Sequence, residues 1–185
     1  MSTATVNPAA VTTWKLDPAH SIAEFKVKHM MISNVKGHFS GLSGDLILHE
    51  PEHTLTRVDA SIDASTVNTG DAARDEHIKL GDFFDIAQFP AITFKSTKVE
   101  PKGGGDFTVT GDLTLRGVTK SVKLAVEGLS EPTKDPWGNL RVGLSATTKI
   151  NRKDFGLTYN AALEAGGILV GEEVSITLEV QFVKA

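Results

Sequence analysis

The sequence of 185 residues contains no cysteine. Disulfide bonds, thiolate metal sites, thiol nucleophiles and thioether lipidation are therefore excluded, and so is a small secreted scaffold held together by disulfides. Long hydrophobic runs are missing as well. Because a transmembrane helix needs about 18 or more consecutive apolar residues, we expect no integral membrane segment.

Positive charge is also scarce. The chain has 19 Lys and Arg residues against 23 Asp and Glu residues, a net charge of −4, and the two signs are interspersed without a basic block. We therefore expect no nucleic-acid partner and no global attraction to an anionic membrane. Hydrophobic residues make up 40% and charged residues 23% of the chain, which is typical of a soluble globular protein.

Residues 1–13 contain no Lys or Arg and no apolar run of signal-peptide length, and Pro8 interrupts them. This composition predicts a disordered leader over residues 1–13 and a single domain over residues 14–185. Without a signal peptide, the expected location is the cytoplasm.

Alternation of apolar and polar residues dominates the rest of the chain. In residues 21–29, for example, Ala23, Phe25 and Val27 alternate with charged residues. Similar runs cover residues 35–40, 57–62, 107–116, 121–127, 140–144 and 174–182, and Gly-rich turn signals such as residues 102–106 separate some of them. Each run has one apolar and one polar face, which predicts antiparallel strands.

One segment, residues 69–89, breaks this alternation. It opens on Asp71, a candidate helix N-cap, and continues with good helix formers and a group of apolar residues near its end. We expect one helix or two short helices that cover one opening of a β-structure.

The predicted strands share one apolar face that must be buried. A sandwich and a closed barrel both achieve this, and the periodicity does not distinguish them. A barrel of about eight strands has room for a small ligand, so its apolar lining is a candidate binding cavity.

Several segments of the chain carry a further signal through their number and order. They are residues 14–21 (WKLDPAHS), 25–29 (FKVKH), 35–39 (VKGHF), 68–70 (NTG), 74–77 (RDEH), 82–85 (DFFD), 89–94 (FPAITF), 111–118 (GDLTLRGV) and 152–156 (RKDFG). Together they resemble the YceI-like family, and the resemblance extends from Trp14 to about Phe182.

The resemblance implies a mainly β fold, an extended lipocalin-like antiparallel barrel of about eight strands with a short helical insert near residues 71–88. It also implies a long apolar ligand inside the barrel, a polyisoprenoid or isoprenoid quinone, and no other cofactor. Many family members carry a signal peptide, work in the bacterial periplasm and are described as stress-related or transport-related. This sequence lacks such a signal.

Inward-facing positions of the predicted strands, together with Phe84 of the helical insert, are the candidates for contact with the lipid. The predicted lipid-binding residues are Phe25, His29, Phe39, Phe84, Phe94, Phe107, Leu113, Leu124, Leu144 and Ile176. For each of them, ordinary core packing is the alternative.

His29 differs from the other candidates because it is polar and continues the apolar face of its strand. At a barrel mouth it could meet a polar head group such as a quinone carbonyl or a phosphate. The alternative is a buried histidine whose ring bonds to the backbone.

Five charged residues of the family-like segments, Arg74, Asp75, Asp82, Arg152 and Asp154, also allow two interpretations. Ion pairs that fix the helical insert and the turn at Arg152 are one. A head-group role for Arg152 or Arg74 is the other.

Residues 49–53 (HEPEH) match the H-E-x-x-H zinc signature. That chemistry requires both imidazoles one turn apart on a helix. Pro51 inside the motif and the strand-like residues before it favour a solvated hairpin loop, so we predict no metal site here.

Asp17, His20 and Ser21 are the residue types of a hydrolase triad, but proximity in sequence is not triad geometry. No Gly-rich elbow presents the serine, and local capping hydrogen bonds explain Asp17 and Ser21 better. We predict no catalytic residue.

The sequence thus favours a non-enzymatic protein that binds an apolar lipid for sequestration, storage or transport. The alternatives are a small-molecule enzyme that uses the same cavity and a stress-related structural module whose core is filled by side chains. Oligomeric state is open, and an apolar rim of the barrel could pair as a homodimer.

Overall fold

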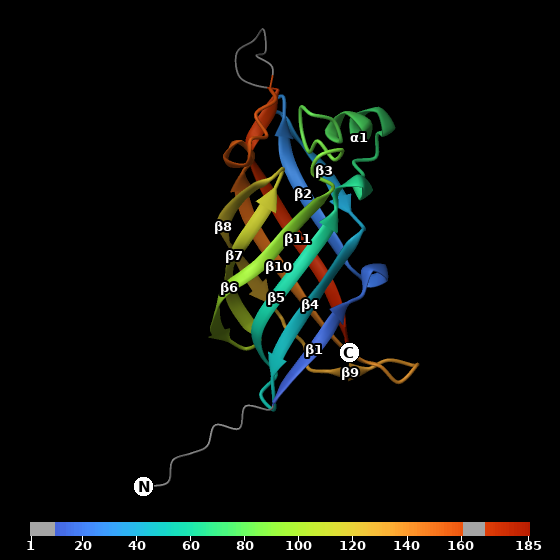
Figure 1. The fold of residues 1–185 in the computed structure, drawn as a ribbon, viewed down its shortest axis with the longest axis vertical. Helices are drawn as coiled ribbons and strands as arrows, with labels where there is room; N and C mark the ends of the chain where they lie inside the picture. Colours follow the sequence, from blue (N-terminus) through green and yellow to red (C-terminus); the bar gives the residue numbers. More distant parts are fainter. Residues whose placement is uncertain (1–9, 161–168) are drawn as a thin grey trace.

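The alternating segments form one antiparallel sheet that closes on itself (Figure 1). The structure, a computed structural model, describes residues 10–160 and 169–185. The strands are β1 (Val11–Leu16), β2 (Ile22–His29), β3 (Ser33–Phe39), β4 (Leu42–His49), β5 (Thr54–Asp63), β6 (Ala91–Gly103), β7 (Asp106–Leu115), β8 (Val118–Glu127), β9 (Thr133–Lys134), β10 (Leu140–Asn151) and β11 (Val170–Lys184). The helix α1 spans Ala72–Ile78, and three 3₁₀ turns are Pro18–His20, Ala64–Thr66 and Arg152–Phe155.

Closure of the barrel depends on β11. Along one side, β11 pairs with β10. On its other side, the C-terminal residues of β11 pair with β1, and the earlier part of the strand pairs with β2. β1 and β2 therefore behave as one long strand interrupted by the 3₁₀ turn Pro18–His20, and β3 and β4 flank them in the same way. The eight strands β11, β1, β4, β5, β6, β7, β8 and β10 complete the circuit. This confirms the predicted fold class.

The two ends of the barrel differ (Figure 1). We call the end that carries α1, the β2–β3 turn and the 3₁₀ turn Arg152–Phe155 the lid end. The opposite end, which carries the β4–β5 and β6–β7 turns and the C-terminus, is the closed end. The β6–β7 turn contains Gly103, Gly104 and Gly105, all with positive φ, as expected for the glycine-rich hairpin loop.

The helical insert is shorter than the predicted residues 71–88. Asp71 is its N-cap, as predicted, and the carboxylate accepts a hydrogen bond from the backbone of Arg74. The helix ends at Ile78, and the chain then folds back in turns in which Phe84 N–H donates to the carbonyl of Ile78. This reversal satisfies a carbonyl at the helix end and brings the apolar residues that follow toward the barrel.

The N-terminal boundary also differs from the expected one. The strand β1 begins at Val11, three residues inside the predicted leader, because Val11–Thr13 pair with β4. The indole N–H of Trp14 donates to Thr12 Oγ1, which donates in turn to Glu50. These bonds hold the first strand in the sheet; residues 1–9 lie outside the described residues. Within the described part of the chain, no helix is long and apolar enough to span a membrane.

Near the closed end, Arg141 forms ion pairs with Asp135 in the preceding turn and with Asp17, which is distant in sequence. Its Nη1 lies 2.6 Å from Asp17 Oδ2, and its Nε lies 2.8 Å from Asp135 Oδ2. The hydrogen bonds from Arg141 lower the pKa of both carboxyl groups to about 2. Arg141 therefore fixes the bend between β1 and β2 against the turn that precedes β10.

We expect this cluster to make the fold sensitive to acid. A carboxyl whose pKa is lowered in the folded state stabilises that state above the unfolded pKa near 3.8, and this stabilisation is lost as the pH falls toward about 2. Arg141→Met should therefore lower the free energy of unfolding at neutral pH and flatten its fall between about pH 4 and pH 2. Urea denaturation across this pH range measures both effects.

Lys15→Met is the matched control, because it removes an exposed ion pair with Asp45 on the barrel surface. Its loss of stability with falling pH should follow the curve of the unmodified protein. If Arg141→Met follows that same curve, the cluster does not carry the acid sensitivity.

Candidate functional site

The interior of the barrel contains a cavity of about 240 Å³. Every strand except the two-residue β9 contributes to its wall. Among the wall residues only Glu24, Thr93, Thr148 and Arg152 are polar. The site is therefore an apolar space inside a hydrogen-bonded shell.

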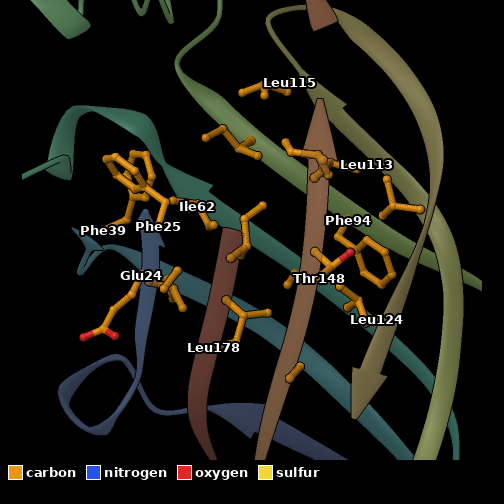
Figure 2. Close-up of a pocket in the computed structure, with 18 of the residues that line it drawn as sticks. Glu24, Phe25, Phe39, Ile62, Phe94, Leu113, Leu115, Leu124, Thr148 and Leu178 are labelled. Atoms are coloured by element: carbon orange, nitrogen blue, oxygen red, sulfur yellow. The ribbon is translucent and has the colours of Figure 1, made fainter. Parts of the chain in front are cut away.

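Alternation along the strands produces most of this wall. On β11, the residues Val174, Ile176, Leu178, Val180 and Phe182 all face the cavity, and the residues between them do not. The Thr148 hydroxyl donates to the backbone carbonyl of Lys123, so it is already satisfied. Figure 2 shows the close-up, in which the Glu24 carboxylate points away from the apolar side chains.

Large buried side chains fill the barrel at the closed end. They are not part of the cavity wall but belong to the same apolar core: Trp14, Leu48, Phe107, Val109 and Val142. These side chains therefore occupy part of the interior at the closed end, beside wall residues such as Leu55 and Val126.

Aromatic contacts attach the insert to the barrel at the other end. The rings of Phe25 and Phe39 lie 5.6 Å apart, and Phe39 meets Phe84 of the insert edge to face at 5.6 Å. Phe84, Phe83 and Ile78 also face the cavity. We call residues 71–89 the lid, because they cover the cavity at the lid end (Figure 1).

A second group of rings holds the outer part of the lid. His77 contacts both Phe83 and Tyr159 at 5.2 Å, and its Nε2 lies 3.0 Å from Asp82. Asp75 accepts hydrogen bonds from the backbone and hydroxyl of Thr69. The lid is thus attached by ring contacts and local hydrogen bonds.

Two wall aromatics lie across glycines on neighbouring strands. A Cβ atom at Gly37 would collide with the ring of Phe25, and one at Gly111 would collide with the ring of Phe94. Figure 2 shows these two aromatics on the cavity wall. Glycine at both positions gives the rings space to lie against the backbone, which leaves the middle of the barrel open.

Arg152 is the buried cation of the wall, with 4% of its surface exposed. Its guanidinium donates to the carbonyl oxygens of Gly171, Leu157 and Val170 at 2.7, 2.6 and 3.0 Å. Burial lowers the pKa of the guanidinium from its ordinary value. Arg152 therefore fastens the start of β11 to the turn after β10.

The expected ion pair at Arg152 is replaced by these three bonds to carbonyls. Within residues 10–160 and 169–185 its donors reach no carboxylate. Arg74 likewise bonds to the hydroxyl and carbonyl oxygens of Thr69, and Asp154 is exposed. Asp82 is the member of this group that forms an ion-pair contact, with His77.

Most of the predicted lipid-binding residues lie on the cavity wall: Phe25, Phe39, Phe84, Phe94, Leu113, Leu124, Leu144 and Ile176. Phe107 does not, because it is the first inward position of β7 and belongs to the packed closed end. His29 occupies the last pair of β2, beside Ser33 and Val170, and is also outside the wall. Its lid-end position agrees with the expected barrel mouth, and its contact with a head group stays a prediction.

Many wall residues were not among the predicted ones; the apolar ones that lie outside the strands are Ile78, Phe83 and Leu157. The dense apolar group near the end of the insert was the signal that could have identified Ile78 and Phe83. Leu157 follows an irregular turn, where no periodicity indicates which side chain faces inward.

The two motifs rejected as catalytic lie in ordinary structural settings. Residues 49–53 comprise the end of β4 and the β4–β5 turn, as predicted, with His53 Nδ1 2.7 Å from Glu50. In the described ranges no group of three or more His, Asp or Glu side chains is placed to hold a metal ion. Asp17 binds Arg141 and His20, whereas the Ser21 hydroxyl bonds to the backbone of Gln181.

Comparison with known proteins gives a consistent result. The model of the YceI-like domain matches residues 14–182. A UPF0312 protein of Vibrio parahaemolyticus is 41% identical over 139 residues, which cover 75% of this chain and 73% of that protein. A UPF0312 protein of Staphylococcus aureus is 36% identical over 178 residues, 93% of this chain and 98% of that protein.

Solved structures share the barrel. A YceI protein of Campylobacter jejuni has a TM-score of 0.72 at 30% identity, over 86% of this chain and 91% of that one. BcnA of Burkholderia cenocepacia has a TM-score of 0.76 at 23% identity, over 90% and 98% of the two chains. A polyisoprenoid-binding domain from Saccharophagus degradans, implicated in plant cell wall breakdown, has a TM-score of 0.65 at 18% identity, over 94% and 99%. The last two likenesses concern the fold alone.

Arg152→Met should destabilise the protein by about 3 kcal/mol, because three carbonyl oxygens lose their donor in a region that water reaches poorly. Arg152→Lys should recover only part of this loss, since an ammonium group cannot match the planar geometry of the guanidinium. Chemical denaturation gives these free energies. Lys153→Met, at the neighbouring exposed position, is the control; an equal loss there would contradict the assignment.

Proposed function

The chain belongs to the YceI-like family, and on this basis we propose that its barrel binds a long apolar lipid chain of the polyisoprenoid or isoprenoid-quinone type. The observation that carries the proposal is the apolar cavity inside the barrel, between the packed closed end and the lid. The Saccharophagus degradans domain, a polyisoprenoid-binding domain, adds support from a protein of the same fold.

The size and the apolar lining of the cavity suit such a ligand. An apolar cavity of roughly 150 Å³ stays dry and takes up a molecule such as benzene. The cavity of about 240 Å³ therefore has room for a segment of branched hydrocarbon. A longer chain would need the lid to shift, and each methylene that it buries contributes about 0.8 kcal/mol.

Binding is favoured over catalysis by the chemistry of the wall. Acid–base catalysis needs a pair of titratable groups that can reach the substrate. The ionisable residues of the described wall are Glu24, which is exposed, and Arg152, whose donors are bonded to carbonyls. A single fixed cation without an adjacent base suits a binding site.

The rival interpretation, a structural module with a filled core, is disfavoured by the cavity itself. A protein selected only for stability has no reason to leave an apolar space of this size, because empty volume costs packing energy. The rings of Phe25 and Phe94 occupy the space that a side chain at Gly37 or Gly111 would fill, which helps to keep this volume open.

Within this proposal the protein sequesters, stores or transports its lipid, with the chain inside the barrel and a polar head group at the lid end. His29, placed at that end, and Arg152, in the wall beneath it, are the candidates for contact with the head group. A cytoplasmic location and a homodimer stay predictions.

The first test is organic extraction of the purified protein, followed by mass spectrometry of the extract, with native mass spectrometry of the intact protein alongside. A stoichiometric compound with a prenyl chain is expected. A protein that is empty and also fails to bind added isoprenoid quinones and prenyl phosphates would contradict the proposal.

A matched pair of variants locates the ligand. Ala146 is buried on the cavity wall, whereas Ala125 is exposed on the outer face of β8. Ala146→Phe should fill part of the cavity and weaken binding of an isoprenoid quinone about tenfold or more, because the chain loses several buried methylenes. Ala125→Phe should leave the affinity unchanged. Fluorescence titration of both variants gives the dissociation constants.

Thermal unfolding of both variants establishes that they are folded. Ala60→Leu, also on the wall, replaces Ala146→Phe if that variant is too destabilised to purify. For the unmodified protein, affinity should rise with the number of isoprene units and then level off when the cavity is full. Equal affinity for Ala146→Phe and Ala125→Phe would place the ligand outside the barrel.

A further inference from the structure

The turn between β2 and β3 presents three adjacent apolar side chains to solvent. Met30, Met31 and Ile32 are 41%, 64% and 78% exposed, and no other turn of the described chain carries such a run. We call these three residues the apolar tip. It lies at the lid end of the barrel, the same end as the lid (Figure 1).

The backbone of the apolar tip is unfavourable for the residues that it holds. Met30 and Met31 have φ values of 51° and 60°, in the left-handed region that glycine and asparagine adopt more readily. Ile32 N–H donates to the carbonyl of His29, and Met30 N–H donates to that of Leu169, so the turn is fixed. A tight turn whose stability alone mattered would favour Asn-Gly at Met30 and Met31.

Lysines follow the apolar tip along both strands of the hairpin. Lys26, Lys28 and Lys36 are all exposed, and Lys26 is directly opposite Lys36 in the β2–β3 register. Like charges at such positions repel each other. None of the three forms an ion pair within residues 10–160 and 169–185. The one acidic residue of the hairpin, Glu24, lies opposite His38.

From this arrangement we propose that the β2–β3 hairpin docks the lid end of the barrel onto an anionic lipid bilayer. The apolar tip enters the interface between head groups and acyl chains, and the three lysines contact anionic head groups. Leu80 of the lid is also exposed at this end. Two of the five lid carboxylates are paired with cations, Glu76 with Lys79 and Asp82 with His77.

The proposal does not depend on the lipid inside the cavity. Docking rests on an exposed turn and three surface lysines, whereas the proposed function rests on the cavity wall. Vesicle binding and binding of an isoprenoid quinone are therefore measured separately, and either can fail without the other.

The experiment is flotation of the full chain with vesicles. One set contains phosphatidylglycerol and phosphatidylcholine in equal amounts, and the other contains phosphatidylcholine alone. The unmodified protein should bind the anionic vesicles at low salt, bind the neutral ones far less, and be released as salt is added.

Two variants remove the two parts of the contact. Met30→Asn with Met31→Gly removes most of the apolar tip and suits the turn, so binding should weaken about tenfold or more while thermal stability does not fall. Lys26→Gln, Lys28→Gln and Lys36→Gln together should weaken binding about fivefold per lysine and flatten its salt dependence. Trp137→Ser, which removes an exposed aromatic from the closed end, is the control and should bind as the unmodified protein does.

Binding that is equal for neutral and anionic vesicles, or that survives both hairpin variants, would overturn the proposal. So would loss of binding in Trp137→Ser, because the contact would then lie at the closed end. If the protein ignores vesicles and instead forms a dimer that Met30→Asn with Met31→Gly disrupts, the apolar tip is a self-association surface and the membrane proposal is wrong.

Discussion

The pairing of β11 with strands on both of its sides is the constraint on which the rest of the structure depends. Its register with β10 and with β1 and β2 brings the C-terminal strand back to the N-terminal one and closes the sheet. Once the sheet is closed, every inward side chain faces the same interior, and the backbone needs no further partner there. The cavity is largely apolar for this reason: alternation places most of the polar side chains of each strand outside. The polar wall groups of Thr148 and Arg152 are bonded to backbone carbonyls.

Closure alone does not leave a cavity, because side chains can fill a barrel of eight strands. At the closed end they do, with Trp14 and Phe107 among the filling residues. In the middle, Phe25 and Phe94 lie across Gly37 and Gly111, so these rings occupy the wall. The two halves of the barrel therefore use aromatic side chains differently, and for Phe25 and Phe94 a glycine on the neighbouring strand provides the space beside the ring.

This difference also marks how far the sequence could predict the site. Alternation is local, so it correctly identified the inward side of residues such as Leu124 and Ile176, and the cap at Asp71 was equally local. The depth of a residue in the barrel is set by long-range register, which alternation does not contain. Phe107 and Leu113 have the same pattern on β7, yet one packs in the closed end and the other faces the cavity. For Arg152, the family-like segment indicated importance, but only the folded chain shows carbonyl acceptors where carboxylates were expected.

The same reasoning applies to charge. A net charge of −4 gives no reason to expect attraction to an anionic surface. This expectation describes the molecule as a whole. The β2–β3 register nevertheless concentrates three lysines beside an apolar turn, and a membrane contact responds to charge within about a Debye length, roughly 10 Å, of the surface.

Because the closed end is packed, a long chain has to enter or leave a hollow barrel through the lid end. The apolar tip lies at that end, so docking there would bring the lid against the bilayer in which such chains are dissolved, and the chain would cross between the two apolar phases with little exposure to water.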